Sequence, residues 1–303
     1  MTDPEGYAVY EGPAAGDTIE IEGIQPWSHA APVLYHAVLT LRDADGVLQE
    51  VVPYDIGFRR FEMINGVMCL NGERVVFNGV NRHEWNADRG RAIGADDMHA
   101  AMAVFKKNNI NAVRTCHYPD QSLWYDLCDR NGIYMIDETN LESHGSWQKL
   151  GAVEPSWNVP GSLPEWKDCV VDRARSMFER DKNHAAVLIW SCGNESYAGE
   201  DILAMSQFFH DHDPGRLVHY EGVFHCRAFD AISDMESRMY AKPWEIREYL
   251  ESTRRSPSFS ASICTIWATR WAHGELCALA DEFDQYQGGF IWGLHGPGAP
   301  AHR

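Results

Sequence analysis

The chain has 303 residues, of which 45% are hydrophobic, so it is long and apolar enough to bury a sizeable core. Its formal net charge of −18 argues against nucleic acid or an anionic membrane as a partner, because both need a basic face, whereas a neutral sugar is compatible. The eight cysteines lack CxxC spacing and the first residues carry no signal-peptide pattern, so we expect reduced thiols and a cytoplasmic protein.

The first 57 residues are predicted to be all-β. Ile19–Glu22 and Tyr35–Leu41 alternate between polar and apolar side chains, and Asp43–Gly46 is typical of a turn. This segment is too short for a free-standing sandwich. We therefore expect residues 1–57 to be the last strands of a partial β-sandwich domain whose beginning is absent.

From about residue 58, strand patterns alternate with helical ones, which indicates an α/β fold. Helical periodicity is clearest over 96–107, 123–130, 166–180 and 201–210. Strands are expected near residues 75–80, 110–114, 132–137, 186–192, 216–220, 230–234, 257–263 and 287–292. Eight strands with intervening helices predict a (β/α)8 TIM barrel over 58–303. The chain stops just after the eighth strand, so we expect the barrel to be C-terminally truncated.

The apolar run Ala185–Ile189 leads directly into Trp190–Ser196, which contains an Asn-Glu pair. A buried parallel strand delivers such a pair to its carboxyl end, the face of a barrel that carries the chemistry. Asn194 can bond a substrate hydroxyl, and Glu195 can act as acid, base or nucleophile. Two polar residues after a strand are, taken alone, usually just a loop.

Other predicted strands also end in polar clusters, which makes a shared site at one face of the barrel the better interpretation. These clusters are Asn81–Glu84, Arg114–Pro119, Asp137–Gly145, Arg238–Tyr240 and Gly288–Trp292.

One of these clusters has the donors of a cation site. Glu142 and His144 lie two apart in an extended loop, so both side chains can point the same way. With Glu195 they could bind a hard cation, for which Mg²⁺ or Mn²⁺ suits the donors better than Zn²⁺.

In order and spacing, these motifs resemble the β-galactosidases of glycoside hydrolase family 2. Asn81–Glu84, Arg114–Pro119, Asp137–Gly145 and Ile189–Ser196 match, as do Gln287–Trp292 and the junction Gly57–Glu62. The resemblance covers nearly the whole chain. It implies the end of an immunoglobulin-like sandwich followed by the catalytic barrel of a retaining hydrolase that acts on terminal β-galactosides such as lactose.

The resemblance also assigns roles to single residues. Glu195 matches the acid/base, and Asn194 matches the residue that bonds the sugar 2-hydroxyl. Residues matching substrate-binding positions are His83, His117, Tyr240 and Trp292. Glu142, His144 and Glu195 match the Mg²⁺ ligands, whereas the family's Na⁺ ligands lie mostly outside this chain. Full-length relatives are expected to be homo-oligomers.

Strand seven departs from the family pattern. A retaining glycosidase needs a second carboxylate about 5–5.5 Å from the first. The family supplies it in a motif like Cys-Glu-Tyr-x-His-x-Met-Gly-Asn-Ser, but here no acidic residue lies between Glu251 and Glu275. The family spacing back from Trp292 falls near Ala261. This copy is therefore predicted to be impaired, because no glycosyl-enzyme can form without a nucleophile.

A shifted reading frame would explain this departure. With suitable codons, Ser260–Trp271 read two bases later becomes Cys-Glu-Tyr-Met-His-Asp-Met-Gly-Asn-Ser-Val. Gly293–Ala299, read one base later, becomes Asp-Phe-Met-Asp-Gln-Ala-Leu, which continues the family pattern. True divergence of strand seven is the alternative.

Three other functions remain open at this point. The chain could be an inactive remnant that still binds galactosides, or a related enzyme such as a β-glucuronidase, although relatives of that kind lack the Glu142–His144 pair. A purely structural scaffold ranks last, because it leaves the aligned polar strand ends unexplained.

Overall fold

Eight parallel strands form the central sheet of the protein. The computed structural model describes residues 1–13, 18–147, 158–253, 262–266 and 273–292. The strands are β6 (Phe77–Arg82), β7 (Ala112–Thr115), β8 (Tyr134–Glu138), β9 (Val187–Ser191), β10 (Leu217–His219), β11 (Glu236–Met239), β12 (Ser262–Ile266) and β13 (Tyr286–Ile291). Their order is β10-β9-β8-β7-β6-β13-β12-β11, and all neighbouring pairs are parallel.

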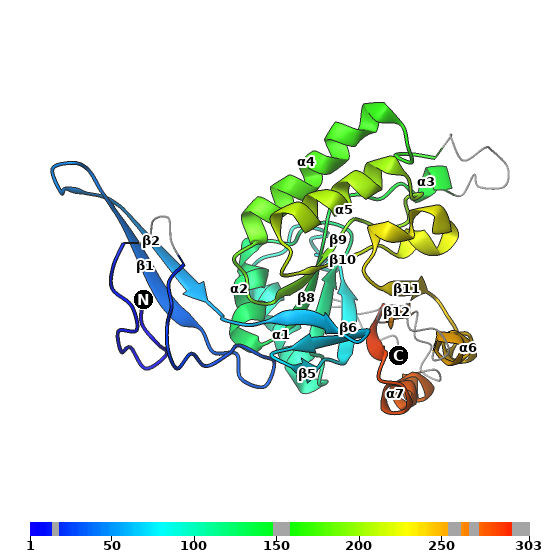
Figure 1. The fold of residues 1–303 in the computed structure, drawn as a ribbon, viewed down its shortest axis with the longest axis horizontal. Coiled ribbons are helices and arrows are strands. Elements are labelled where there is room, and N and C mark those ends of the chain that lie inside the picture. Colours follow the sequence, from blue (N-terminus) through cyan, green and yellow to red (C-terminus); the bar gives the residue numbers. More distant parts are fainter. Residues whose placement is uncertain (14–17, 148–157, 254–261, 267–272, 293–303) are drawn as a thin grey trace.

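Helices follow the strands in sequence and cover the outside of the sheet (Figure 1). They are α1 (Ala95–Lys107), α2 (Ser122–Asn131), α3 (His144–Trp147), α4 (Pro164–Asp181), α5 (Glu200–His212), α6 (Pro243–Thr253) and α7 (His273–Glu282), with 3₁₀ turns η2 (Glu221–His225) and η3 (Arg227–Ile232). None of the helices in the described part of the chain has the length and apolar character needed to cross a membrane. The predicted (β/α)8 fold is confirmed.

Strands β7, β8 and β9 are buried on both faces, which is why residues such as Ala185–Ile189 read as an apolar run. All residues of β7, β8 and β9 are buried, because the barrel interior covers one face and the helices cover the other. Polar groups at the carboxyl ends of these strands are therefore held on rigid supports.

The sheet has a seam between β10 and β11, which are not paired with each other. Residues just before β11 bridge this seam. The amide of Asp234 donates to the carbonyl of Val218 at 2.9 Å, and the amide of Val218 donates to Asp234 Oδ2 at 2.7 Å. The amide of Tyr220 donates to Ser233 Oγ at 3.1 Å.

The strand predicted near 230–234 is wrong. Residues up to Ile232 form η3, and the sixth barrel strand is β11. Its sequence, Glu-Ser-Arg-Met, has no apolar run. Glu236 is nevertheless buried, and its charge is balanced by ion pairs with Arg227 at 2.7 Å and Arg238 at 2.8 Å. A hydrophobicity pattern cannot detect a strand whose burial depends on paired charges.

The N-terminal part holds a long antiparallel hairpin that projects away from the barrel (Figure 1). Its strands are β1 (Tyr35–Arg42) and β2 (Leu48–Ile56), so the strand predicted over Tyr35–Leu41 is confirmed. The strand predicted over Ile19–Glu22 is wrong, because this segment pairs with no other strand in the part of the chain that the structure describes.

A small three-stranded sheet next to the barrel was not predicted. It contains β3 (Phe61–Ile64), β4 (Val67–Leu70) and β5 (Glu73–Arg74). Asn-Gly pairs at 65–66 and 71–72 make its two turns, with positive φ at all four residues. Asn-Gly between short apolar runs is the sequence signal that identifies such hairpins.

Gly288 allows β13 to pack against β6. Its φ is +91°, and a Cβ atom there would lie 2.1 Å from the carbonyl oxygen of Phe77. We expect Gly288→Ala to lower the free energy of unfolding by about 3 kcal/mol or more, because strain and backbone overlap combine. Urea denaturation measures this loss.

Gly46→Ala is the matched control for that substitution. Gly46 has a φ of +79° with nothing within 4 Å of a built Cβ atom, so only the left-handed conformation is penalised. Its expected loss is about 1–2 kcal/mol. Equal losses at the two positions would contradict the argument from close packing.

Candidate active site

A buried ion pair lies at the ends of β7 and β8. Arg114 Nε donates to Glu138 Oε2 at 2.6 Å, and the side chains of both residues are at most 1% exposed. The other guanidinium nitrogens of Arg114 donate to Asn194 Oδ1 at 2.9 Å and Asn81 Oδ1 at 3.3 Å. Burial opposes the charged form of Glu138, but Arg114 and His117 outweigh it and hold the pKa of this carboxyl below its usual value.

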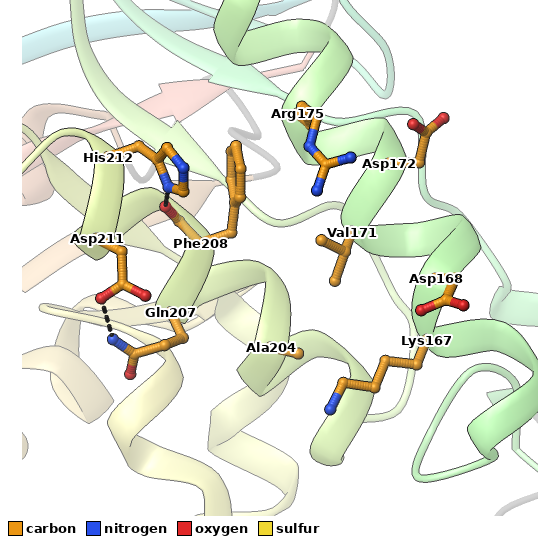
Figure 2. A pocket seen from close by; sticks show the side chains of 10 residues that line it. All are labelled: Lys167, Asp168, Val171, Asp172, Arg175, Ala204, Gln207, Phe208, Asp211 and His212. Atoms are coloured by element: carbon orange, nitrogen blue, oxygen red, sulfur yellow. Dashed lines mark hydrogen bonds between the residues drawn. The ribbon is translucent and has the colours of Figure 1, made fainter.

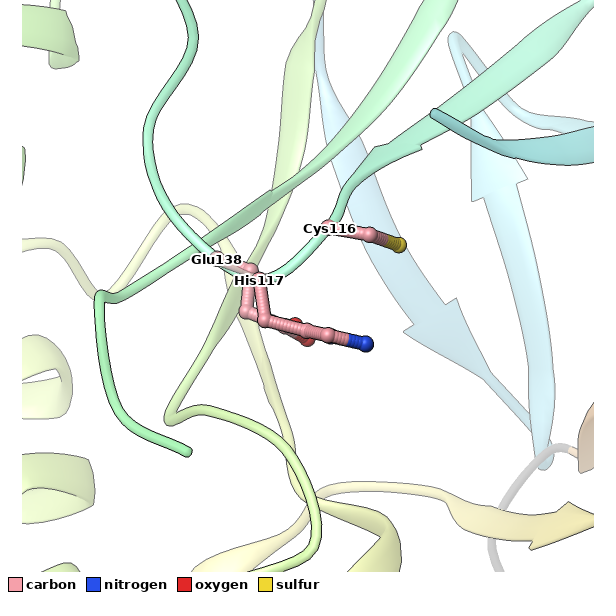
Figure 3. Close-up of side chains that lie close together, drawn as sticks. All are labelled: Cys116, His117 and Glu138. Carbon is pink, nitrogen blue, oxygen red and sulfur yellow. The ribbon is translucent and has the colours of Figure 1, made fainter. Parts of the chain in front are cut away.

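Cys116 and His117 form a compact cluster with Glu138, the acidic member of this pair (Figure 3). His117 Nδ1 lies 2.7 Å from Glu138 Oε1, and Ser191 Oγ donates to Glu138 Oε2 at 2.8 Å. Burial raises the pKa of the Cys116 thiol well above its usual value. The cluster therefore offers a protonated thiol and a carboxylate already engaged by three donors, which is a poor set of ligands for a metal.

Glu142, His144 and Glu195 do come together, as the sequence suggests. His144 Nδ1 lies 2.7 Å from Glu195 Oε2, and one potential ligand atom from each of the three residues lies within 4.8 Å of the others. The side-chain amide nitrogen of Asn194 donates to Glu142 Oε2, and the backbones of these two residues also form an isolated parallel β-bridge. Two carboxylates and one imidazole at this spacing fit a hard divalent cation.

The carboxyl group of Glu195 is mostly buried, with 13% of the side chain exposed. Burial raises its pKa, the positive field of His144 opposes that rise, and the nearby carboxylate of Glu142 adds to it. A carboxyl group with a raised pKa is suited to proton transfer near neutral pH.

Aromatic rings form a second part of the site. The rings of His83 and Trp292 stack at 5.5 Å with an interplanar angle of 21°, and His117 meets both at 5.4 Å edge to face. Burial, and after it the charge of Glu195, raise the pKa of Tyr240, which follows β11 directly. Rings in this arrangement can contact the apolar face of a sugar.

Several residues of the site were not assigned roles from the sequence. Arg114 and Glu138 lie inside the polar clusters, but pairing between neighbouring strands became visible only in the fold. Glu221, two residues after β10, accepts the backbone N–H of Glu195 at 2.8 Å. The sequence signal that could have identified Glu221 is its place as an acidic residue directly after the strand predicted near 216–220. The stretch around Ala261, where the carboxylate of strand seven is missing, lies outside the described residues.

A groove of about 570 Å³ lies between α4 and α5 (Figure 2). Its side chains include Lys167, Asp172, Arg175, Phe208 and His212. They share no residue with the groups described above, so this groove has no part in the candidate site.

Comparison with known proteins gives consistent matches along the chain. The family model for the TIM barrel domain of the glycosyl hydrolases of family 2 matches residues 61–301, and a second model described as glycosyl hydrolases family 2 matches residues 4–59. A β-galactosidase of Halalkalibacterium halodurans is 58% identical over 88% of this chain and 26% of its own length. A β-galactosidase large subunit of Lactobacillus acidophilus is 52% identical over 90% of this chain and 44% of its own length.

Among solved structures, a β-glucuronidase from Ruminococcus gnavus in complex with D-glucuronic acid superimposes with a TM-score of 0.78. It is 19% identical, covering 97% of this chain and 55% of that one, so the likeness concerns the fold. The chain spans between a quarter and a half of the length of the two β-galactosidases.

We predict that His219 is a neutral imidazole with its proton on Nδ1. Ser191 gives its single hydroxyl hydrogen to Glu138, so it can only accept from His219 Nδ1, which lies 3.0 Å away. Burial and the charge of Arg114 lower the pKa of His219 to about 3. Long-range ¹H–¹⁵N spectra should show a protonated Nδ1 and a bare Nε2 between pH 5 and 8, and a titrating ring would contradict this assignment.

Proposed function

Because the chain belongs to glycosyl hydrolase family 2, we propose that it is the part of a β-galactosidase that binds the terminal galactose and protonates the leaving oxygen. The observation that carries this proposal is Glu195, a carboxyl with raised pKa in contact with His144 at the carboxyl end of β9. The names of the relatives at 58% and 52% identity support galactose as the sugar.

In the proposed mechanism, Glu195 gives its proton to the glycosidic oxygen as the bond to the anomeric carbon breaks. In a complete retaining enzyme, where a second carboxylate first forms a glycosyl-enzyme, the same group would then take a proton from the water that releases the sugar. Burial raises the pKa of this carboxyl group, which favours the acid form that the first step needs.

Asn194 is oriented for the sugar 2-hydroxyl by its neighbours. Its side-chain oxygen accepts from Arg114 at 2.9 Å, and its amide nitrogen donates to Glu142. One amide hydrogen is left for a ligand. A hydrogen bond to the 2-hydroxyl that strengthens in the transition state is a known source of rate in this chemistry.

We propose that Glu142, His144 and Glu195 hold Mg²⁺, with Mn²⁺ as a substitute. The donor set supports this, because two carboxylates and an imidazole leave room for water ligands. When bound, the cation would supply positive charge beside the acid/base and fix its orientation. The hydrogen bond from the side-chain amide of Asn194 already orients Glu142, one of the three proposed ligands.

The second carboxylate is the open part of the proposal. With no acidic residue between Glu251 and Glu275, we propose that this copy is impaired in forming a glycosyl-enzyme. Sequencing the source DNA across the codons for residues 252–303 separates a shifted frame from true divergence. A restored Glu codon near Ala261 would make the native protein an intact retaining enzyme.

Two wider expectations belong to the same proposal. The large-subunit name of one relative favours assembly of the complete protein from more than one chain. The free thiols of Cys69, Cys116, Cys128, Cys169, Cys192 and Cys226 are consistent with a reducing, cytoplasmic location.

We predict slow turnover of an activated aryl β-galactoside, on the order of 10⁴-fold or more below that of a complete relative. Azide should accelerate it and give α-galactosyl azide, because a small anion can attack from the face that the missing carboxylate leaves open. Product analysis by NMR and release of the aryl group measure both effects. Fast hydrolysis without an azide effect would show that a nucleophile is present.

Two controls define what is being measured. Glu195→Gln should slow substrates with poor leaving groups far more than activated aryl substrates, because only the former need the proton. An aryl β-glucuronide tests the alternative suggested by the R. gnavus structures. Preference for the glucuronide would overturn galactose as the substrate, and galactose binding with no turnover of any substrate would favour the inactive remnant.

We predict that Mn²⁺, observed by electron paramagnetic resonance, binds the intact chain and that His144→Ala weakens it by more than about tenfold. Removing the imidazole leaves two carboxylates that repel each other. Glu142→Gln should have a comparable effect, whereas Glu200→Gln, an exposed carboxylate at the start of α5, should have none. Unchanged affinity in His144→Ala would exclude this site.

A further inference from the structure

We propose that Glu221 is a positioning residue that fixes the backbone of Glu195, and through it the carboxyl group that faces His144. The inference rests on the proposed role of Glu195. It adds a residue that belongs to the next barrel strand and lies outside the sequence motif.

The backbone around Glu195 has a conformation that its own sequence does not favour. Glu195 has a φ of +39°, and Gly193 has a φ of +132°. A glutamate in the left-handed region is strained, so the surrounding structure must hold it there. A residue with a side chain would not fit in place of Gly193, because a Cβ atom there would lie 2.7 Å from the carbonyl oxygen of Leu141.

Two consecutive residues after β10 hold this turn. Glu221 Oε1 accepts the N–H of Glu195 at 2.8 Å, and the hydroxyl oxygen of Tyr220 accepts the N–H of Ser196 at 3.1 Å. The Tyr220 hydroxyl also donates to the carbonyl of Ser196. The amide of Asn194 is tied separately to Leu141, at 2.8 Å. The backbone amides of Asn194, Glu195 and Ser196 therefore each have their own acceptor.

Glu221 acts from behind the site rather than inside it. The residue is 4% exposed, so its contact with Glu195 is through the backbone and a sugar cannot reach it. Its second carboxylate oxygen is buried and makes no hydrogen bond to any of the residues that the structure describes. Burial of a carboxylate oxygen without a hydrogen bond is costly. The hydrogen bond that Glu221 Oε1 accepts from the strained turn at Glu195 accounts for a glutamate at this buried position.

Hydrogen exchange at single residues tests the proposal without any need for turnover. In Glu221→Met, which keeps the length but loses the acceptor, the amide of Glu195 should exchange at least about tenfold faster while the amides of β9 stay protected. In Glu221→Gln the amide carbonyl can accept the same N–H, so protection should return. Tyr220→Phe should expose the amide of Ser196 and leave that of Glu195 unchanged.

The affinity for Mn²⁺ separates positioning from a purely structural role. Glu221→Met should weaken Mn²⁺ binding by roughly 10-fold or more, with Glu221→Gln within twofold of the unsubstituted chain. Unchanged exchange and affinity in Glu221→Met would overturn the proposal, as would equal losses in Glu221→Gln and Glu221→Met. If the unsubstituted chain binds no Mn²⁺, the metal proposal fails, and the exchange data alone then decide the role of Glu221.

Discussion

The arrangement of the site depends on the buried pair of Arg114 and Glu138. Two opposite charges removed from water are tolerated only when their remaining polar atoms are also satisfied. Here Arg114 also donates to Asn81 and Asn194, while Glu138 also accepts from Ser191 and lies against His117. The pair therefore joins the ends of β6, β7, β8 and the segment after β9. Loss of either partner would leave an uncompensated charge among all of them.

Around that pair, the site divides its chemistry between two environments. On one side, rings of His83, His117 and Trp292 offer an apolar surface. On the other, Glu142, His144 and Glu195 gather negative charge and an imidazole. The side-chain amide of Asn194 accepts from Arg114 and donates to Glu142, so its orientation is fixed on both sides.

Rigidity and strain occur together at this face. The strands are buried on both sides, so their ends cannot move independently of the core. The turn at Glu195 adopts a costly conformation that is held by hydrogen bonds from the backbone amides of Glu195 and Ser196 to the side chains of Glu221 and Tyr220. Strain of this kind survives where the neighbouring structure overdetermines it, and it is common at sites that do chemistry.

The sequence alone was sufficient for the barrel, because buried parallel strands leave apolar runs at regular intervals and their carboxyl ends meet at one face. The Glu-x-His spacing and the strand end at Glu195 also suggested that Glu142, His144 and Glu195 could share a cation site, and the structure brings the three side chains together. The sequence did not reveal the strand Glu236–Met239, whose burial depends on ion pairs with Arg227 and Arg238 rather than on hydrophobicity. Nor did it reveal the roles of Arg114, Glu138 and Glu221. Their partners come from other strands, 24 residues away for Arg114–Glu138 and 26 for Glu221–Glu195, so only the closed fold decides which charges are paired and which backbone amides they hold.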